Sequence, residues 1–295
     1  MTEAPRSLDK TAGQTGWNLL QRKVQEHRVS QIFNVFRETG IEPILIKGFA
    51  AGRYYPETML REFIDVDLAV AKSDFKRSEI LCNSAALDGF AVDLHDELRH
   101  FDTLDWKDLF ANSELIDAEN GTFRVLRRED HLRVLCVHWL TDGGSNRERL
   151  WDIHYAVATR ESNFDWDRFL NSVGENRRRW LVCTLGLAHR YLGLDLSDTP
   201  IENEAMNIPD WLINTVEYEW SRKNPDTPLE LALRDRKTLL TQIASRFRQN
   251  PIWATIQMEG SFDAKTRVFY QTGLFFYRIP ASFRRVKTEL ASRNK

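Results

Sequence analysis

The stretch Phe63-Ile-Asp-Val-Asp-Leu-Ala-Val70 governs how the rest of the chain is interpreted. Its side chains alternate in polarity, which predicts a strand with one face toward a core. The second face carries two carboxylates, Asp65 and Asp67, roughly 6–7 Å apart by strand geometry. Two like charges on a half-buried face repel each other unless a cation lies between them. The apolar face of this strand is expected to hold Ile64, Val66, Leu68 and Val70.

A divalent cation would remove that repulsion. Mg²⁺ takes oxygen ligands and commonly binds one or two protein carboxylates together with substrate phosphates. The alternative, from this stretch alone, is a strand whose polar face looks into water. The sequence on either side favours the first interpretation.

Composition bounds the class of protein. The chain has 295 residues, which is long for one core and suggests two lobes. Its 42% hydrophobic and 28% charged residues are typical of a soluble globular protein, and no apolar run approaches the ~18 residues of a membrane-spanning helix. The N-terminus lacks the apolar core of a signal peptide, and three widely spaced cysteines fit neither a disulfide framework nor a metal knuckle. We therefore expect a cytoplasmic protein with buried thiols.

The net charge of −2 hides an asymmetry. Residues 264–295 contain eight Lys or Arg and one acid, so this end carries +7 and the remainder −9. A basic segment of this kind can contact nucleic acid or an acidic partner. The alternative is a solvated helix face.

Residues 13–127 predict a small mixed β-sheet with helices, and residues 1–12 are expected to be disordered. Short apolar or alternating runs indicate strands, and longer runs with helical spacing indicate helices. Gly40 is placed to end the first helix, and Ser73 or Asp74 to cap a later one. The expected elements are helix 17–39, strand 43–46, helix 49–55, strand 63–70, helix 73–87, strand 90–95 and a hairpin over 114–126 with Asn120-Gly121 at its turn.

Residues 128–295 are helical in character, with breaks at glycine and proline. The sequence therefore predicts an α+β N-terminal lobe followed by an all-α helical lobe. The candidate helices are 130–140, 147–159, 166–172, 178–192, 209–222, 229–248 and 269–290.

Three carboxylates stand on two of the predicted strands: Asp65, Asp67 and Asp93. His95 shares the predicted face of Asp93. Upstream, a buried strand breaks into a glycine turn at Lys47-Gly48, where backbone N–H groups and a lysine could hold phosphates.

This ordered set resembles the nucleotidyltransferases of the polymerase-β type. The resemblance rests on Leu45-Ile-Lys-Gly48, Arg61-x-x-x-Asp65-Val-Asp67 and Val92-Asp93-Leu-His95. It is closer to the bacterial branch often labelled "uncharacterised nucleotidyltransferase", which has a Leu-Lys-Gly turn where other members of the superfamily have Gly-Ser or Gly-Gly. Three segments of the helical half extend the resemblance to roughly residues 40–200: His131-Leu-x-x-Leu-x-x-His138, Leu150-Trp-Asp152 and residues 180–194.

The resemblance implies a metal site and its chemistry. Asp65 and Asp67 would ligate two Mg²⁺ ions, with Mn²⁺ as the alternative, and Asp93 would complete one metal site and serve or assist as the base. In-line attack at the α-phosphorus of a nucleoside triphosphate would release pyrophosphate.

The resemblance also implies contacts to the nucleotide. Lys47 and the Gly48 amide would hold the β- and γ-phosphates, and Arg61 would pair with phosphate or orient the aspartate strand. Structural ion pairs are the alternative for Lys47 and Arg61. His95 is either a nucleotide contact or a hydrogen-bonded strand histidine. His138 and Asp152 are interpreted as packed or hydrogen-bonded residues of the helical lobe.

The leading hypothesis is therefore a Mg²⁺-dependent nucleotidyltransferase (EC 2.7.7 type) that moves a nucleoside monophosphate onto an acceptor. The acceptor is left open among a small molecule, a peptide or protein side chain, and an RNA end. One alternative is a catalytically degenerate binding module, which would be favoured if Asp93 faced away from Asp65. Another is a phosphotransferase on the same scaffold, although the sequence has no Gly-x-Gly-x-x-Gly loop or His-Arg-Asp segment.

Overall fold

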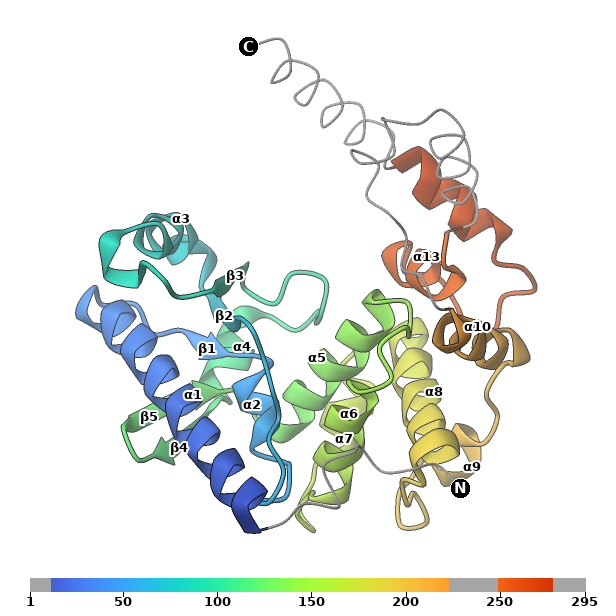
Figure 1. Ribbon diagram of the computed structural model, residues 1–295. Helices are drawn as coiled ribbons and strands as arrows, with labels where there is room; N and C mark the ends of the chain where they lie inside the picture. Colours follow the sequence, from blue (N-terminus) through green and yellow to red (C-terminus); the bar gives the residue numbers. More distant parts are fainter. Residues whose placement is uncertain (1–11, 223–248, 278–295) are drawn as a thin grey trace, which may run out of the picture. The chain divides into compact units, whose positions relative to one another are not determined.

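The computed structural model describes residues 12–222 and 249–277 (Figure 1). These residues form a five-stranded mixed sheet with helices before and after it, which confirms the predicted α+β class. None of the described helices is long and apolar enough to cross a membrane. The three cysteines are free, and Cys136 and Cys183 are buried as expected, whereas Cys82 is only partly buried.

The chain packs as two compact units. Among the described residues, the first unit contains residues 12–138 and 148–206, and the second contains residues 139–147, 207–222 and 249–277. The whole sheet and all the candidate site residues belong to the first unit. The lobe boundary predicted between residues 127 and 128 stays a prediction.

The sheet has the strand order β3-β2-β1-β5-β4. β2 pairs with β3 in parallel and with β1 in antiparallel orientation, β1 pairs with β5 in parallel, and β4 and β5 form the predicted hairpin. The hairpin turn is Glu119-Asn120, one residue earlier than expected. The strands are β1 Ile44–Leu45, β2 Val66–Val70, β3 Val92–Asp96, β4 Glu114–Ala118 and β5 Gly121–Val125.

β2 is covered on both faces, because all five of its residues are buried. Val66, Leu68 and Val70 enter the hydrophobic core, as predicted. The predicted strand was too long at its N-terminal end, where Ile64 is 87% exposed. Pairing of β2 with β3 begins at Val66 and Val92, so residue 64 has no strand partner that would hold it on the apolar face.

Helix α1 (Ala12–Glu38) begins five residues before the predicted start, and Gly40 follows it with φ +78°. Its C-terminal half carries fully buried residues from Val29 to Phe36 that pack in the core of the sheet, and the helix runs alongside β5 (Figure 1). Its N-terminal half leaves Trp17 and Leu20 more than half exposed. Ala12 is helical, contrary to the expected disorder, and residues 1–11 lie outside the described residues.

The region from residue 72 to 113 departs from the sequence-based assignment. One expected helix is two elements, α3 (Lys72–Cys82) and a short 3₁₀ helix over Ala85–Leu87, and neither Ser73 nor Asp74 caps α3 because its N-cap is Ala71. Helix α4 (Trp106–Ala111), capped by the carboxylate of Asp105, was not predicted.

After residue 125 no described residue is in a strand, which agrees with the predicted helical character. The expected helix 229–248 and the part of helix 269–290 beyond residue 277 lie outside the described residues, and residues 268–277 are helical. The helices, together with the short α2 between β1 and β2, are α2 Phe49–Gly52, α5 Arg128–Thr141, α6 Leu150–Ala158, α7 Trp166–Asn171, α8 Glu175–Leu192, α9 Glu202–Ala205, α10 Asp210–Ser221 and α13 Pro251–Gln257.

His131 joins α5 to the residue that follows β1. Its buried ring donates from Nε2 to the carbonyl oxygen of Ile46 at 3.0 Å and accepts at Nδ1 from the hydroxyl of Tyr54 at 2.9 Å. Arg53 donates in turn to that hydroxyl. Burial and the charge of Arg53 hold the pKa of His131 well below its usual range. A neutral imidazole therefore fixes the backbone immediately before Lys47.

We expect the His131→Gln variant to lose about 1–3 kcal/mol of unfolding free energy at pH 7.5, because the buried Tyr54 hydroxyl loses its acceptor. Wild-type His131 stays neutral in the folded state and takes up a proton in the unfolded state below about pH 6.5. The contribution of His131 to wild-type stability therefore falls by up to about 1.4 kcal/mol per pH unit in that range. The variant has no histidine at this position to titrate, so the difference in unfolding free energy between wild type and variant should shrink between pH 7 and pH 5. Urea unfolding at several pH values measures this difference.

Tyr54→Phe is the matched control, because it removes the same hydrogen bond and keeps the titrating histidine. Its unfolding free energy should fall with acid as steeply as that of the wild type. A His131→Gln deficit that is constant with pH would contradict the neutral state of the buried ring.

Candidate active site

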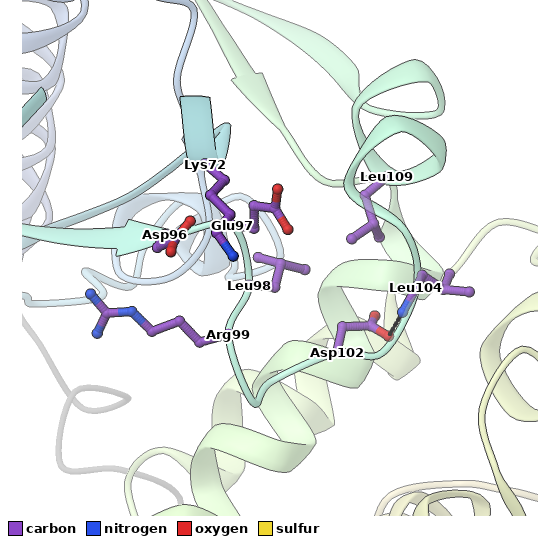
Figure 2. Close-up of a pocket in the computed structure, with 8 residues that line it drawn as sticks. All are labelled: Lys72, Asp96, Glu97, Leu98, Arg99, Asp102, Leu104 and Leu109. Carbon is purple, nitrogen blue, oxygen red and sulfur yellow. Dashed lines mark hydrogen bonds between the residues drawn. The ribbon is translucent and has the colours of Figure 1, made fainter. Parts of the chain in front are cut away.

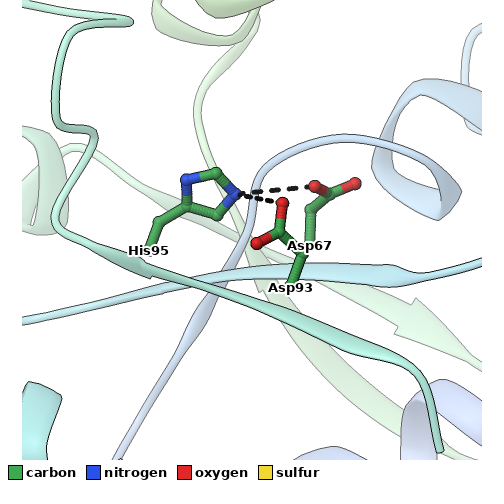
Figure 3. Close-up of side chains that lie close together, drawn as sticks. All are labelled: Asp67, Asp93 and His95. Atoms are coloured by element: carbon green, nitrogen blue, oxygen red, sulfur yellow. Dashed lines mark hydrogen bonds and ion pairs between the residues drawn. The ribbon is translucent and has the colours of Figure 1, made fainter. Parts of the chain in front are cut away.

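Asp67 and Asp93 occupy paired positions on neighbouring parallel strands. The register of β2 and β3 places Asp67 opposite Asp93, so both side chains leave the sheet on one face, while Leu68 and Leu94 serve the core on the other. Asp67 is 6% exposed and the side chain of Asp93 is 45% exposed. The two carboxylates lie side by side and both face the ring of His95 (Figure 3).

Lys47 brings a positive charge to these carboxylates. It follows β1, and the amide of Ile46 still pairs with the carbonyl of Asp67, which holds the lysine beside β2. Its Nζ lies 2.5 Å from Asp67 Oδ1 and 3.9 Å from Asp93 Oδ2. The lysine side chain is only 10% exposed. A buried ammonium group therefore balances the repulsion between Asp67 and Asp93, whereas the repulsion predicted from the sequence was between Asp65 and Asp67.

His95 completes the cluster from the face of β3 that carries Asp93. Its Nε2 lies 3.1 Å from Asp93 Oδ2 and 3.5 Å from Asp67 Oδ1 (Figure 3). Burial opposes a charge on the ring, but the hydrogen bonds to Asp67 and Asp93 outweigh it and raise the pKa of His95. The hydrogen bond from His95 in turn lowers the pKa of Asp93 to about 2, against the effect of burial and with help from the charge of Lys47.

The donor set fits a divalent cation through its carboxylates. Among the residues that the structure describes, Asp67, Asp93 and His95 form a group whose ligand atoms lie within 4.8 Å of one another. Carboxylate oxygens are the ligands that Mg²⁺ and Mn²⁺ favour. A ligating histidine normally donates its other ring N–H to an acceptor, and the buried Nδ1 of His95 has no hydrogen-bond partner. His95 therefore fits a role as donor to the two carboxylates better than a role as ligand.

Asp65 lies apart from this group. It is an exposed residue in the bend that precedes β2 by one position, and not a strand residue as expected. Its side chain is not among the three whose ligand atoms converge. The metal role expected for Asp65 stays a prediction.

Gly48 forms the turn from β1 into α2 with φ +50° and ψ −108°, a backbone conformation that residues with a Cβ rarely adopt. A Cβ built at this position would lie 3.3 Å from both Cβ and Cγ of Phe63. The glycine thus allows the first residue of the aspartate stretch to pack directly on the lysine turn.

We expect Gly48→Ala to cost about 2 kcal/mol or more of unfolding free energy, because backbone strain and contact with Phe63 add. Gly193→Ala is the matched control. Gly193 also has a positive φ, at the C-cap of α8, but a Cβ there meets nothing within 4 Å. It should cost about 1 kcal/mol. If thermal unfolding gave the same loss of stability for Gly48→Ala and Gly193→Ala, the tight packing of the Gly48 turn would be contradicted.

Arg61 makes a bidentate ion pair with Asp152 of α6. Its Nε and Nη2 donate to the two carboxylate oxygens at 2.7 and 2.8 Å, and the hydroxyl of Tyr55 donates to Oδ1 at 2.6 Å. Asp152 is 3% exposed. Burial disfavours the charge of Arg61, but the hydrogen bonds and charge of Asp152 outweigh it and raise the arginine pKa. This is the structural ion pair that the sequence left as an alternative, and a phosphate contact by Arg61 stays a prediction.

We expect Arg61→Gln to cost about 3–5 kcal/mol of unfolding free energy, because it leaves the carboxylate of Asp152 buried without a cation. The double variant Arg61→Gln/Asp152→Asn should recover much of that loss, since no buried charge remains. Denaturant unfolding of the two single variants and the double variant gives the coupling free energy between Arg61 and Asp152. If the stability losses of the single variants simply added in the double variant, the ion pair would not be the source of the loss.

Phe101 covers the cluster from the loop that follows β3. Its ring lies 5.2 Å from Lys47 Nζ, and its centroid is 5.5 Å from the rings of His95 and His138. His138 accepts from Arg149 at 2.8 Å, and burial with the charges of Lys47 and Arg149 lowers its pKa to about 2. The side of the site next to Lys47 is therefore aromatic and largely closed to water, since Phe101 is 4% exposed.

Two buried arginines hold this loop in place. Arg177 of α8 donates to the carbonyl oxygens of His100 and Phe101 at 3.0 and 3.4 Å. Arg133 of α5 donates to the carboxylate of Asp102 at 2.8 Å, and both side chains are almost fully buried. The helices that follow the sheet thus position Phe101 over Lys47.

The same loop lines a pocket of about 240 Å³ with residues at the ends of β3, α3 and α4 (Figure 2). Glu97 and Arg99 adopt left-handed backbone conformations there, with φ +53° and +51°. Asp102 accepts the backbone N–H groups of Thr103 and Leu104. The lining contains both acidic side chains (Asp96, Glu97 and Asp102) and basic ones (Lys72 and Arg99), so it favours no single charge of ligand.

Sequence reasoning missed Phe101 and the Arg133–Asp102 and Arg177 contacts. Helical spacing placed Arg133 in a helix. The sequence of residues 97–102 contains no pattern that would predict that this loop packs over Lys47.

The comparison with protein families agrees with the motif. Residues 3–86 match the model of a family described as "Uncharacterised nucleotidyltransferase". The match supports assignment to the nucleotidyltransferases. It includes Lys47, Gly48, Arg61 and the Asp65–Asp67 segment, and it ends before β3, so Asp93 and His95 lie outside it. No curated protein and no solved structure matches the chain.

Proposed function

We propose that this protein is a divalent-metal-dependent nucleotidyltransferase that moves a nucleoside monophosphate from a nucleoside triphosphate to an acceptor and releases pyrophosphate. The observation that carries the proposal is the in-register pair Asp67 and Asp93 with the ammonium of Lys47 between them. The family match supports nucleotidyl transfer in general.

Asp67 and Asp93 would hold the cation, Mg²⁺ or Mn²⁺, and we include Asp65 as a further proposed ligand from the bend before β2. The bound cation would supply Lewis-acid stabilisation of the charge that develops on the phosphates. The low pKa of Asp93 keeps its carboxylate ionised throughout the neutral range. Such a group suits cation binding better than proton abstraction, because a good general base has a pKa nearer the working pH.

Lys47 and the Gly48 turn would meet the phosphates, because they begin a helix beside the carboxylates. Both cations are paired with a carboxylate, Arg61 with Asp152 and Lys47 with Asp67, and Lys47 is the one whose partner is a proposed cation ligand. His95 would orient the two carboxylates by donating to them.

The geometry favours a transferase over a degenerate binding module. The degenerate module was expected to show Asp93 facing away from Asp65, and Asp65 does lie outside the cluster. Oδ2 of Asp93 nevertheless faces His95 and Lys47 in the same cluster as Asp67, which supports the transferase. The phosphotransferase alternative differs in its product, which would be a nucleoside diphosphate in place of pyrophosphate.

The acceptor stays open among a small molecule, a peptide side chain and an RNA end. In the basic segment 264–295, Lys265 and Arg267 are described, and Arg267 donates to the carbonyl of Ser261 and lies over the ring of Trp211. The other basic residues of this segment lie outside the described residues. Contact of this segment with nucleic acid is therefore a proposal from charge alone.

We expect a thermal shift with one or a few of the four nucleoside triphosphates that requires Mg²⁺ or Mn²⁺. At a ligand concentration of 100 times Kd the native state gains about 2.7 kcal/mol, which corresponds to a shift of several degrees. The shift should be lost in Asp67→Asn and Asp93→Asn, each compared with its own baseline. It should persist in Asp117→Asn, which changes an exposed aspartate of β4.

A donor found in this way is then incubated with candidate acceptors, and pyrophosphate and nucleoside diphosphate are measured separately. Nucleotidyl transfer is supported if pyrophosphate is released and if the rate of its release falls about a hundredfold or more in the Asp67 and Asp93 variants. Nucleoside diphosphate would identify a phosphotransferase. No shift with any nucleotide would contradict the proposed function.

A further inference from the structure

Lys47 occupies the position that a cation bound to the two carboxylates would need. We propose that Lys47 is an internal counter-ion that competes with the divalent cation for Asp67 and Asp93, and that the triphosphate relieves this competition by accepting the displaced ammonium. The inference rests on the proposed function and adds to it a coupling between metal binding and nucleotide binding.

The ammonium of Lys47 contacts one of the two carboxylates that would hold the cation and lies near the other. Nζ of Lys47 lies 2.5 Å from Asp67 Oδ1 and 3.9 Å from Asp93 Oδ2, the same two oxygens that His95 Nε2 faces at 3.5 and 3.1 Å. The carboxylate of Asp67 is only 9% exposed, and a buried carboxylate without a positive partner is costly. The site therefore keeps a positive charge in the absence of a metal, and Lys47 supplies it.

Two cations cannot share these oxygens at low cost. A divalent ion bound through Asp67 Oδ1 would stand next to the ammonium, and repulsion between them is strong in a site screened from water by Phe101. Arg61 does not take over the role of counter-ion, because Asp152 holds its guanidinium through two hydrogen bonds. Metal binding thus requires the lysine side chain to move.

The lysine can move without disturbing the turn. The backbone on its N-terminal side is fixed, since His131 donates to the carbonyl of Ile46 and the amide of Ile46 donates to the carbonyl of Asp67. The flexible four-carbon stem of Lys47 carries three donors that rotation about its bonds can redirect. A triphosphate would offer acceptors for these donors and oxygens for the metal together.

The consequence is a reciprocal coupling. Without nucleotide the protein should bind divalent metal weakly, because the metal must displace a buried ion pair. With metal bound, the released ammonium should strengthen the hold on phosphate, and linkage makes the effect equal in both directions.

The experiment compares the wild type with Lys47→Met, which keeps the unbranched stem under Phe101 and removes the charge. Lys47→Gln is a second neutral variant in case the first folds poorly. Lys72→Met is the matched control, since it neutralises an exposed lysine at the start of α3. Electron paramagnetic resonance of free Mn²⁺ gives the Mn²⁺ affinity without nucleotide. Calorimetry gives the affinity for α,β-methylene triphosphate analogues at saturating Mn²⁺.

The expected result is a pair of changes with opposite signs. Neutral variants at Lys47 should bind Mn²⁺ at least about tenfold more tightly than the wild type and bind the analogue at least about tenfold more weakly. Lys72→Met should change neither affinity. A lysine that only stabilises the fold would weaken both affinities when replaced.

Mn²⁺ binding that is unchanged or weaker in the neutral variants would overturn the counter-ion proposal. The proposed function would then still stand if the wild type bound Mn²⁺ and the analogue. Failure of the wild type to bind the analogue in the presence of Mn²⁺ would overturn the proposed function and this inference together.

Discussion

The buried ion pair between Lys47 and Asp67 is the interaction on which the rest of the site depends. It joins the turn after β1 to β2, and it lies on the opposite face of the sheet from Leu68 and the hydrophobic core. A slip of one residue in β2 would turn Asp67 into the core and Leu68 toward Lys47. The desolvation cost of an unpaired carboxylate therefore helps to fix the strand register that places Asp93 opposite Asp67.

The surroundings of this pair make its electrostatics strong. Phe101 covers the ammonium, and the loop that carries it is held by buried arginines of α5 and α8. Removal of water lowers the effective dielectric constant, so each charge acts more strongly on its neighbours. The helices that follow the sheet thus contribute to the site by setting the polarity around it.

Charges near the site are divided between two tasks. Arg61 and Asp152, with Tyr55, form a closed structural set that fastens the loop before β2 to α6. Lys47, Asp67, Asp93 and His95 form a second set in which Asp93 remains half exposed. The second set combines buried charge with a carboxylate that is open to solvent, which is the combination that binding of a charged substrate requires.

The sequence by itself determined the class of the fold and most of the cluster. Strict alternation placed Asp67 and Asp93 on core strands, the glycine turn placed Lys47 before them, and Asn-Gly marked the hairpin to within one residue. These features follow from backbone geometry over a few residues, and local periodicity records them.

Only the tertiary structure decided which charges meet. Arg61 lies 91 residues from Asp152 in the sequence, and no local pattern connects them. The exposure of Ile64 and Asp65 depends on where β3 begins to pair, which the sequence of β2 does not contain. The contact between Lys47 and Asp67 required the antiparallel pairing of β1 with β2. Long-range pairing is set by the free energy of the whole packed unit, so it cannot be obtained from spacing within one segment.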